Sequence, residues 1–583
     1  MRNTPLILGT ISFIVLTFLL NWLGKFHFLY IEQLQLFQST SDYFMERFVE
    51  PGGFSLWLGE LLTQFFILPY GGPVVLSLLL TMIALLCRSI ILKLSPSREL
   101  YLLYYLPVLA LLVIQFDFNY LLGGTIAYLL AVIGFSLYIR LGSDRLRWAC
   151  MLLLIPILFL LGGASACLFT LLLILWEFLS RPFRGWILPV VAIAEFGLLS
   201  VISVSTTWVN DLRFIWSPDL YYHPLVDTPL ILTLSWTLLL LSILLARFCP
   251  EAKTLPRWRV IVETFVQFAC LVGFFWWGFS RFGQSSSLFM KELDYYSRTG
   301  QWDNIIKRCQ RPLNNYLYIN YLNIALAERG LLAESMFSFD QHGLSGLLLS
   351  WDKMYVTTTL LSESYFTIGQ IAVSQECAFE GNVIASRQGS VRHMQRLVQT
   401  NLISGEYVVA EKYLDVLSNT FFYADWAERH RRFLYNDEAV EADPLLGAKR
   451  ALWRAQSGLA NIRGLEGDLL DRLSRKSDDN LAVQYLGAYY LLSKNLQGFK
   501  NLIESYYGTP ALRTLPKSFQ EAVILLAEKD MDYWHRFNLS SQVIQRFAGY
   551  RQVVLGNRNN PQLPAMLSRS FGDTYWFYFI YKK

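Results

Sequence analysis

Three polar segments that interrupt long apolar runs carry the side chains best suited to chemistry. The stretch after the first apolar run contains Glu32 and Asp42, the turn 115–120 contains Asp117, and the loop 208–227 holds charged and aromatic residues. Carboxylates at a membrane surface can accept or position a proton. If the chain is an enzyme, we expect these groups to converge on one face of the membrane, with the three acids as catalytic candidates.

Candidate substrate contacts lie in the loop 208–227 and at one acid inside an apolar run. The loop supplies Arg213, Asp219, Tyr221, Tyr222 and His223. Glu195 lies near the middle of the run 186–207, where an ionised carboxylate costs about 2.5 kcal/mol or more. It is part of an ion or proton relay, lines a polar cavity for a lipid headgroup or, protonated or paired, joins one helix to another.

Neither a metal site nor a cofactor is predicted. His27 and His223 lack the spacing of metal ligands, so we expect both to be solvated loop residues. The sequence contains no CxxC, HExxH, P-loop or GxSxG motif. Cys309 and Cys377 are the two cysteines expected outside the membrane, and a disulfide between them is possible in an oxidising compartment.

The elements that position these residues are predicted to be membrane helices. Of the 583 residues, 54% are hydrophobic and only 16% are charged, whereas soluble chains are about one-quarter charged. The deficit of charged residues lies in residues 1–283. Nine runs there are long and apolar enough to be read as spans, at 5–24, 72–92, 100–116, 121–139, 148–162, 164–180, 186–207, 228–247 and 260–280.

Basic residues predict the orientation of these spans. With the N-terminus inside, the inner segments hold 13 Lys and Arg residues and the outer segments up to residue 283 hold four, as the positive-inside rule requires. The segment 53–69 contains Glu60 and Gln64 and would reverse this alternation if it crossed the membrane. We therefore expect it to be an interfacial or re-entrant helix on the outer face.

Residues 284–583 are expected to form a helical-repeat domain in the periplasm of a bacterium. Their apolar residues follow a helical period, and a short turn followed by an aromatic residue or Leu recurs at Gly300, Gly330, Gly405 and Lys494. This pattern is typical of tetratricopeptide-type hairpins. The predicted fold is therefore all-α, a polytopic transmembrane helix bundle followed by a soluble, divergent α-solenoid that binds a protein or peptide or serves only as a lid.

The sequence resembles a family of bacterial polytopic membrane proteins with no assigned function. The resemblance rests on the stretch 396–427, on Pro51-Gly52-Gly53 with Thr63-Gln64-Phe65-Phe66, and on Phe571-Gly572-Asp573-Thr574-Tyr575-Trp576. It covers most of the chain. It implies a multi-pass inner-membrane protein with a C-terminal helical domain, and no particular chemistry.

The order of loops is also similar in outline to membrane glycosyltransferases of the GT-C type. Such enzymes carry an acidic residue in a long first outer loop, and many end in a periplasmic domain. The resemblance implies that Glu32 or Asp42 is the base and that Asp117 orients the acceptor or binds a divalent metal. Arg213 would then hold the phosphate of a polyprenyl-linked sugar.

Two functions remain open from the sequence. The first is an inner-membrane protein whose periplasmic domain binds a partner or assists envelope assembly; the second is the lipid-linked-sugar transferase. A transporter is disfavoured, because the midplane has one carboxylate and no inverted repeat is apparent. Nucleic acid is not an expected partner, because the net charge of +5 includes no basic block.

Overall fold

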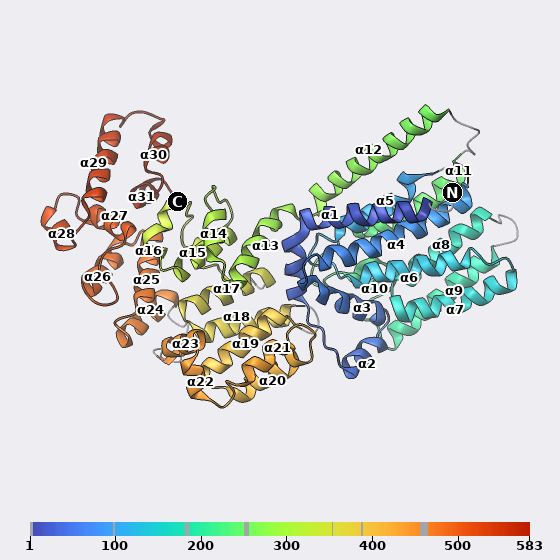
Figure 1. Cartoon of the computed structure of the whole chain (residues 1–583), viewed down its shortest axis with the longest axis horizontal. Helices are drawn as coiled ribbons and strands as arrows, with labels where there is room; N and C mark the ends of the chain where they lie inside the picture. Colours follow the sequence, from blue (N-terminus) through green and yellow to red (C-terminus); the bar gives the residue numbers. More distant parts are fainter. Residues whose placement is uncertain are drawn as a thin grey trace. The chain divides into compact units, whose positions relative to one another are not determined.

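The chain folds into helices that divide into two compact units. The structure, a computed structural model, describes residues 4–96, 99–180, 186–249, 256–352, 354–385, 389–454 and 464–582 (Figure 1). No β-strand occurs in this part of the chain, so the all-α prediction is confirmed. The first unit comprises Met1–Lys291 with Asn419–Phe422, and the second comprises Glu292–Ser418 with Tyr423–Lys583.

A helix occupies each of the nine apolar runs of the first unit. Six are long and apolar enough to cross a membrane: α1 (Thr4–Leu34), α4 (Gly71–Leu94), α7 (Asp144–Gly162), α9 (Ile187–Ser205), α11 (Leu230–Phe248) and α12 (Arg257–Phe282). The shorter three are α5 (Tyr101–Ile114), α6 (Gly123–Tyr138) and α8 (Ser165–Ser180). With 14 to 16 residues, they extend about 21–24 Å, less than the roughly 30 Å of a hydrocarbon core.

The first helix is longer than its apolar run. We predicted a span at 5–24 followed by a polar loop, but α1 continues to Leu34. Its last turns bury polar side chains, among them His27 and Glu32, both 0% exposed. The expectation that His27 is a solvated loop residue is therefore wrong, because the helix carries it into the interior of the unit.

Two short helices follow and pack against the bundle. They are α2 (Ser41–Val49) and α3 (Gly53–Gln64), the second continued by the 3₁₀ turn η1 (Phe65–Ile67). Arg47 forms a 2.6 Å ion pair with Glu60 and joins them. Helix α3 approaches α6 closely, since a Cβ on Gly59 would lie 2.4 Å from the backbone nitrogen of Gly123. Its 12 residues extend about 18 Å, too short for a span.

The second unit begins within α13 (Ser285–Arg298) and consists of successive short helices. They are α14 (Trp302–Arg308), α15 (Tyr316–Glu328), α16 (Leu332–Ser335), η3 (Met336–Ser338), η4 (Leu344–Gly346), α17 (Tyr355–Ile368), α18 (Ile371–Ile384), α19 (Val391–Ser404), α20 (Tyr407–Ser418), α21 (Ala424–Arg431), α22 (Asp437–Ala442), α23 (Pro444–Arg454), α24 (Gly464–Arg475), α25 (Asn480–Leu492), α26 (Leu496–Tyr506), α27 (Lys517–Leu526), α28 (Met531–Arg536), α29 (Ser541–Gly556), α30 (Leu563–Phe571) and α31 (Tyr575–Tyr581).

The recurring turn motif marks reversals between these helices. Gly300, Gly330 and Gly405 have φ values of 67°, 68° and 84°, and Lys494 has a φ of 58°. This left-handed conformation ends one helix and lets the next start two residues later. Helices α17 to α20 then pack as neighbours in sequence order, as Figure 1 shows.

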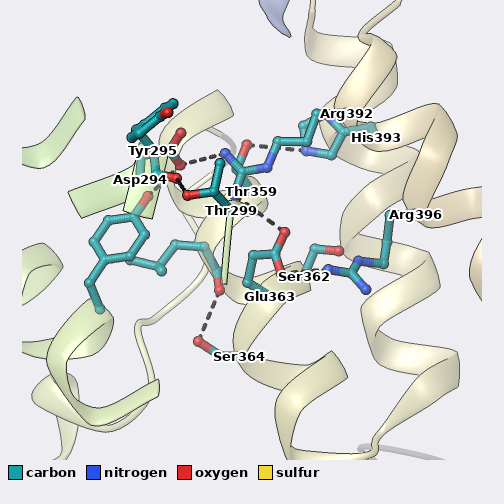
Figure 2. A network of polar contacts seen from close by, with 12 residues as sticks. Asp294, Tyr295, Thr299, Thr359, Ser362, Glu363, Ser364, Arg392, His393 and Arg396 are labelled. Atoms are coloured by element: carbon teal, nitrogen blue, oxygen red, sulfur yellow. Dashed lines mark hydrogen bonds and ion pairs between the residues drawn. The ribbon is translucent and has the colours of Figure 1, made fainter. Parts of the chain in front are cut away.

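A buried ion network holds three helices of the second unit together (Figure 2). Arg392 of α19 is paired with Asp294 of α13 and, at 3.3 Å, with Glu363 of α17. Arg396, one turn later on α19, pairs with the same glutamate. The Tyr321 hydroxyl donates to Asp294 at 2.8 Å. Two cations therefore balance two anions, which is the condition under which buried charges are tolerated.

The aromatic segment at residues 574–581 lies in the core of this unit, as do Cys309 and Cys377. In α31, Tyr575 and Trp576 are 0% exposed, and the Trp576 indole donates to the Glu521 carbonyl at 2.8 Å. Cys309 and Cys377 are free, buried thiols, so the disulfide considered from the sequence is absent. Burial raises the pKa of each thiol to about 12.

Candidate functional site

The turn after α5 and the loop before α11 pair with each other in the first unit. Tyr120 and Tyr222 form an antiparallel bridge. The Leu121 amide donates to the Tyr221 carbonyl at 2.9 Å, and the His223 amide donates to the Asn119 carbonyl at 3.0 Å. Two polar segments more than 100 residues apart in sequence are thus brought together at one end of the helices.

Asp117 is the acidic group at this junction. It is 4% exposed, and its Oδ2 accepts the Tyr222 hydroxyl at 2.7 Å. Its Oδ1 accepts the Asn119 amide at 3.0 Å. Burial, followed by the charge of Asp117, raises the pKa of the Tyr222 phenol. The phenol is therefore a hydrogen-bond donor at neutral pH, and the aspartate has fixed donors for both of its oxygens.

Beside Asp117 lies a buried lysine that donates to a histidine. The Lys291 ammonium of α13 is 2.8 Å from His27 Nδ1, and His27 Nε2 is 2.7 Å from the Gln115 carbonyl. Because a carbonyl can only accept, Nε2 carries the proton and Nδ1 accepts from the ammonium. The geometry therefore requires a neutral imidazole between a cation and a backbone carbonyl.

Aromatic rings enclose the rest of the Lys291 ammonium. It lies 5.1 Å from the centre of the Phe118 ring and 5.9 Å from that of Tyr30, within the range of a cation–π attraction. The residue is 0% exposed. Burial lowers the pKa of Lys291 to about 7, against the opposing effect of the Asp117 charge. This amine can therefore change its charge near neutral pH.

Two other predicted site residues, Glu32 and Tyr221, are buried and hydrogen-bonded. Glu32 is buried near the end of α1, where its carboxylate accepts from Gln33. The Tyr221 hydroxyl donates to the Gly162 carbonyl and accepts the Ser165 amide at 3.0 Å. Tyr221 therefore holds the loop against the start of α8.

Four predicted site residues form no described contact with the Asp117–Lys291 cluster. Asp42 is exposed on α2. Arg213, at the start of α10 (Arg213–Trp216), is half-exposed and forms a 3.2 Å ion pair with Asp219. Asp219 also accepts the Thr228 hydroxyl at 2.9 Å, and Glu195 lies on α9. The described residues contain no group of three His, Cys, Asp or Glu arranged to hold a metal ion.

Lys291 is the residue of this cluster that sequence reasoning missed. Met290, Leu293 and Asp294 are also buried on α13, so the stripe that faces the interior includes Lys291. The one feature of the sequence that indicates a buried lysine is its position between Met290 and Leu293 in this stripe. It does not identify the partner, since His27 is 264 residues away.

Replacing Lys291 by methionine should change how stability depends on pH. The folded-state pKa of about 7 lies below the ordinary lysine value of 10.5, so between these values the folded protein binds fewer protons than the unfolded chain. Wild-type stability should then rise with pH across this window, by up to about 1.4 kcal/mol per unit. We expect Lys291→Met to remove this rise, measured as the unfolding midpoint in detergent from pH 7 to pH 9.

The matched control is Lys307→Met, which removes an exposed lysine of α14. It should retain the wild-type pH slope. Equal slopes in wild type and Lys291→Met would contradict the assignment of a titrating amine to this site.

Comparison with known proteins assigns the chain to a family. No curated protein and no solved structure matched the chain. Residues 2–582 match a family described as of unknown function, DUF6057. Because this match spans nearly all of the 583 residues, the chain belongs to the DUF6057 family.

Proposed function

We propose that the protein is a bacterial inner-membrane protein whose helical C-terminal domain binds a polypeptide partner in the periplasm. The proposal assigns residues 1–283 to the membrane domain, with the segment 53–69 at its outer interface, and residues 284–583 to the periplasmic domain. Six helices with the length and composition of membrane spans support the first assignment. The basic residues of the predicted inner loops support the orientation.

An apolar groove along α29 is the observation that carries the binding function. It has a volume of about 720 Å³ and is lined by apolar residues of α28 and α29, including Trp534, Ile544, Phe547 and Leu555. Glu528 and Arg551 lie at its border and form a 3.5 Å ion pair. A groove with an apolar floor and charged border is suited to the apolar face of an amphipathic helix.

The spacing along α29 supports a helical occupant. Ile544, Ala548 and Leu555 all line the groove, at intervals of four and seven residues that place them on one helix face. Leu555 is 61% exposed, so its side chain is accessible to a partner that enters the groove. The partner would then be a protein with an exposed amphipathic helix.

A photo-crosslinking amino acid at Leu555 tests this function in living cells. We expect a discrete covalent adduct with one partner, and we expect Ala548→Glu to abolish it, because the added carboxylate would be buried in the apolar contact. The control position is Val408 of α20, an exposed apolar residue outside the groove. Equal adducts from both positions, or an adduct unaffected by Ala548→Glu, would contradict partner binding in this groove.

A lipid-linked-sugar transferase at the outer membrane face is the second candidate function. It is favoured by the junction that places Asp117, Tyr222 and the buried end of α1 in one part of the first unit. In this function Asp117 or Glu32 takes the proton of an acceptor hydroxyl as its oxygen bonds to the sugar carbon. The bond from that carbon to the polyprenyl phosphate breaks, and the phosphate keeps the electron pair.

Neutral variants of the buried acids test the transferase. Asp117→Asn and Glu32→Gln should each cause a polyprenyl-linked sugar to accumulate, detected by mass spectrometry of membrane lipids. Asp227→Asn, which changes an exposed acid of the loop 208–227, should leave the lipid pool unchanged. A normal lipid pool in both buried-acid variants, at wild-type protein abundance, would rule out these catalytic assignments.

A further inference from the structure

A polar pocket in the second unit lies where segments far apart in the sequence meet. It has a volume of about 380 Å³ and is lined by the turn after α15, by α16, by the start of α25 and by the loop before α27. Helix α16 packs on both α25 and α27 (Figure 1). The volume lies at the small end of the range for ligand pockets, so a molecule that fits here is small.

Hydrogen bonds between these segments form the pocket without a ligand. The Lys517 amide at the start of α27 donates to Glu334 Oε2 of α16 at 2.7 Å. The Ala333 amide of α16 donates to Gln484 Oε1 of α25 at 3.4 Å, and Gln484 is only 6% exposed. A site that is formed in advance loses little conformational entropy when it binds.

Two opposite charges line this pocket without pairing with each other. Glu334 and Arg513 are both exposed lining residues. No ion pair joins the Glu334 carboxylate to the Arg513 guanidinium, and within the described part of the chain Arg513 has no ion pair at all. Each charge is therefore accessible to a ligand. Hydrogen bonds from an ammonium or a guanidinium to a carboxylate are among the strongest that proteins form.

Apolar side chains form another part of the pocket wall. Leu331, which is 40% exposed, lines it together with Leu515 and the rings of Pro510 and Pro516. None of these side chains can donate or accept a hydrogen bond. The wall is therefore suited to an apolar group that lies between the two charges.

We propose that this pocket binds a small zwitterion of the amino-acid or dipeptide class. The ligand's ammonium donates to Glu334, its carboxylate accepts from Arg513, and its apolar side chain contacts Leu331. A zwitterion neutralises both charges of the pocket, whereas a simple cation or anion is repelled by one of them. This binding is separate from that of a polypeptide in the groove along α29.

Isothermal titration calorimetry on the full chain in lipid nanodiscs tests the proposal. The zwitterionic probes are L-leucine and alanyl-leucine. Leucinamide lacks the carboxylate of leucine, and N-acetylleucine lacks its ammonium. We expect a zwitterion to bind saturably and each derivative to bind about tenfold more weakly, because each loses a charge-assisted hydrogen bond. The tighter of the two zwitterions shows whether the site takes an amino acid or a dipeptide.

Two conservative variants assign the charges. Arg513→Gln should bind leucine no more tightly than leucinamide, and Glu334→Gln should bind leucine no more tightly than N-acetylleucine. Glu334→Gln keeps an oxygen that can accept the Lys517 amide, so the pocket keeps its shape. Because two ligands are compared on the same variant, a loss of folded protein cannot mimic this result. The matched controls Arg569→Gln and Glu376→Gln, exposed residues outside the pocket, should keep the wild-type preference.

Three results would each overturn the proposal. They are the absence of saturable binding by both zwitterions, binding of the derivatives as tightly as leucine, and an unchanged preference in Arg513→Gln or Glu334→Gln.

Discussion

The pairing of the turn after α5 with the loop before α11 closes one end of the first unit, and the polar interior depends on it. The bridge between Tyr120 and Tyr222 brings the Tyr222 hydroxyl to Asp117. The same turn presents the Gln115 carbonyl to His27, which then accepts from Lys291. A buried polar group without a partner costs free energy comparable to a lost hydrogen bond. The loop pairing lowers this cost, because it gives partners to Asp117, His27 and Lys291.

The requirement that buried polar and charged groups have partners also explains the interior of the second unit. Arg392 and Arg396 are balanced by Asp294 and Glu363, and each acid lies on a different helix from the arginines, as Figure 2 shows. Such a network favours one stacking of the helices, since any other leaves a buried charge unpaired. Glu195 is the counterexample in the first unit, where an acid in an apolar helix has an oxygen with no partner among the described residues.

The sequence predicts local structure well here and long-range contacts poorly. Apolar runs locate the nine long apolar helices described in the first unit, because helix length and apolar composition are local properties. The continuation of α1 to Leu34 is not predicted, because its last turns contain polar residues that only tertiary packing buries. Asp117 and Tyr222 were both candidates, but their contact depends on loop pairing. Lys291 was missed because nothing near it in sequence indicates His27.

The most direct test of this account is the side of the membrane on which the second unit lies. The native Cys309 and Cys377 are buried and give no signal, so exposed cysteines are introduced at Lys412 in α20 and at Gly142 between α6 and α7. In intact spheroplasts, a membrane-impermeant maleimide should label Lys412→Cys at once and Gly142→Cys only after lysis. The reverse pattern would place the second unit in the cytoplasm and contradict the proposed function.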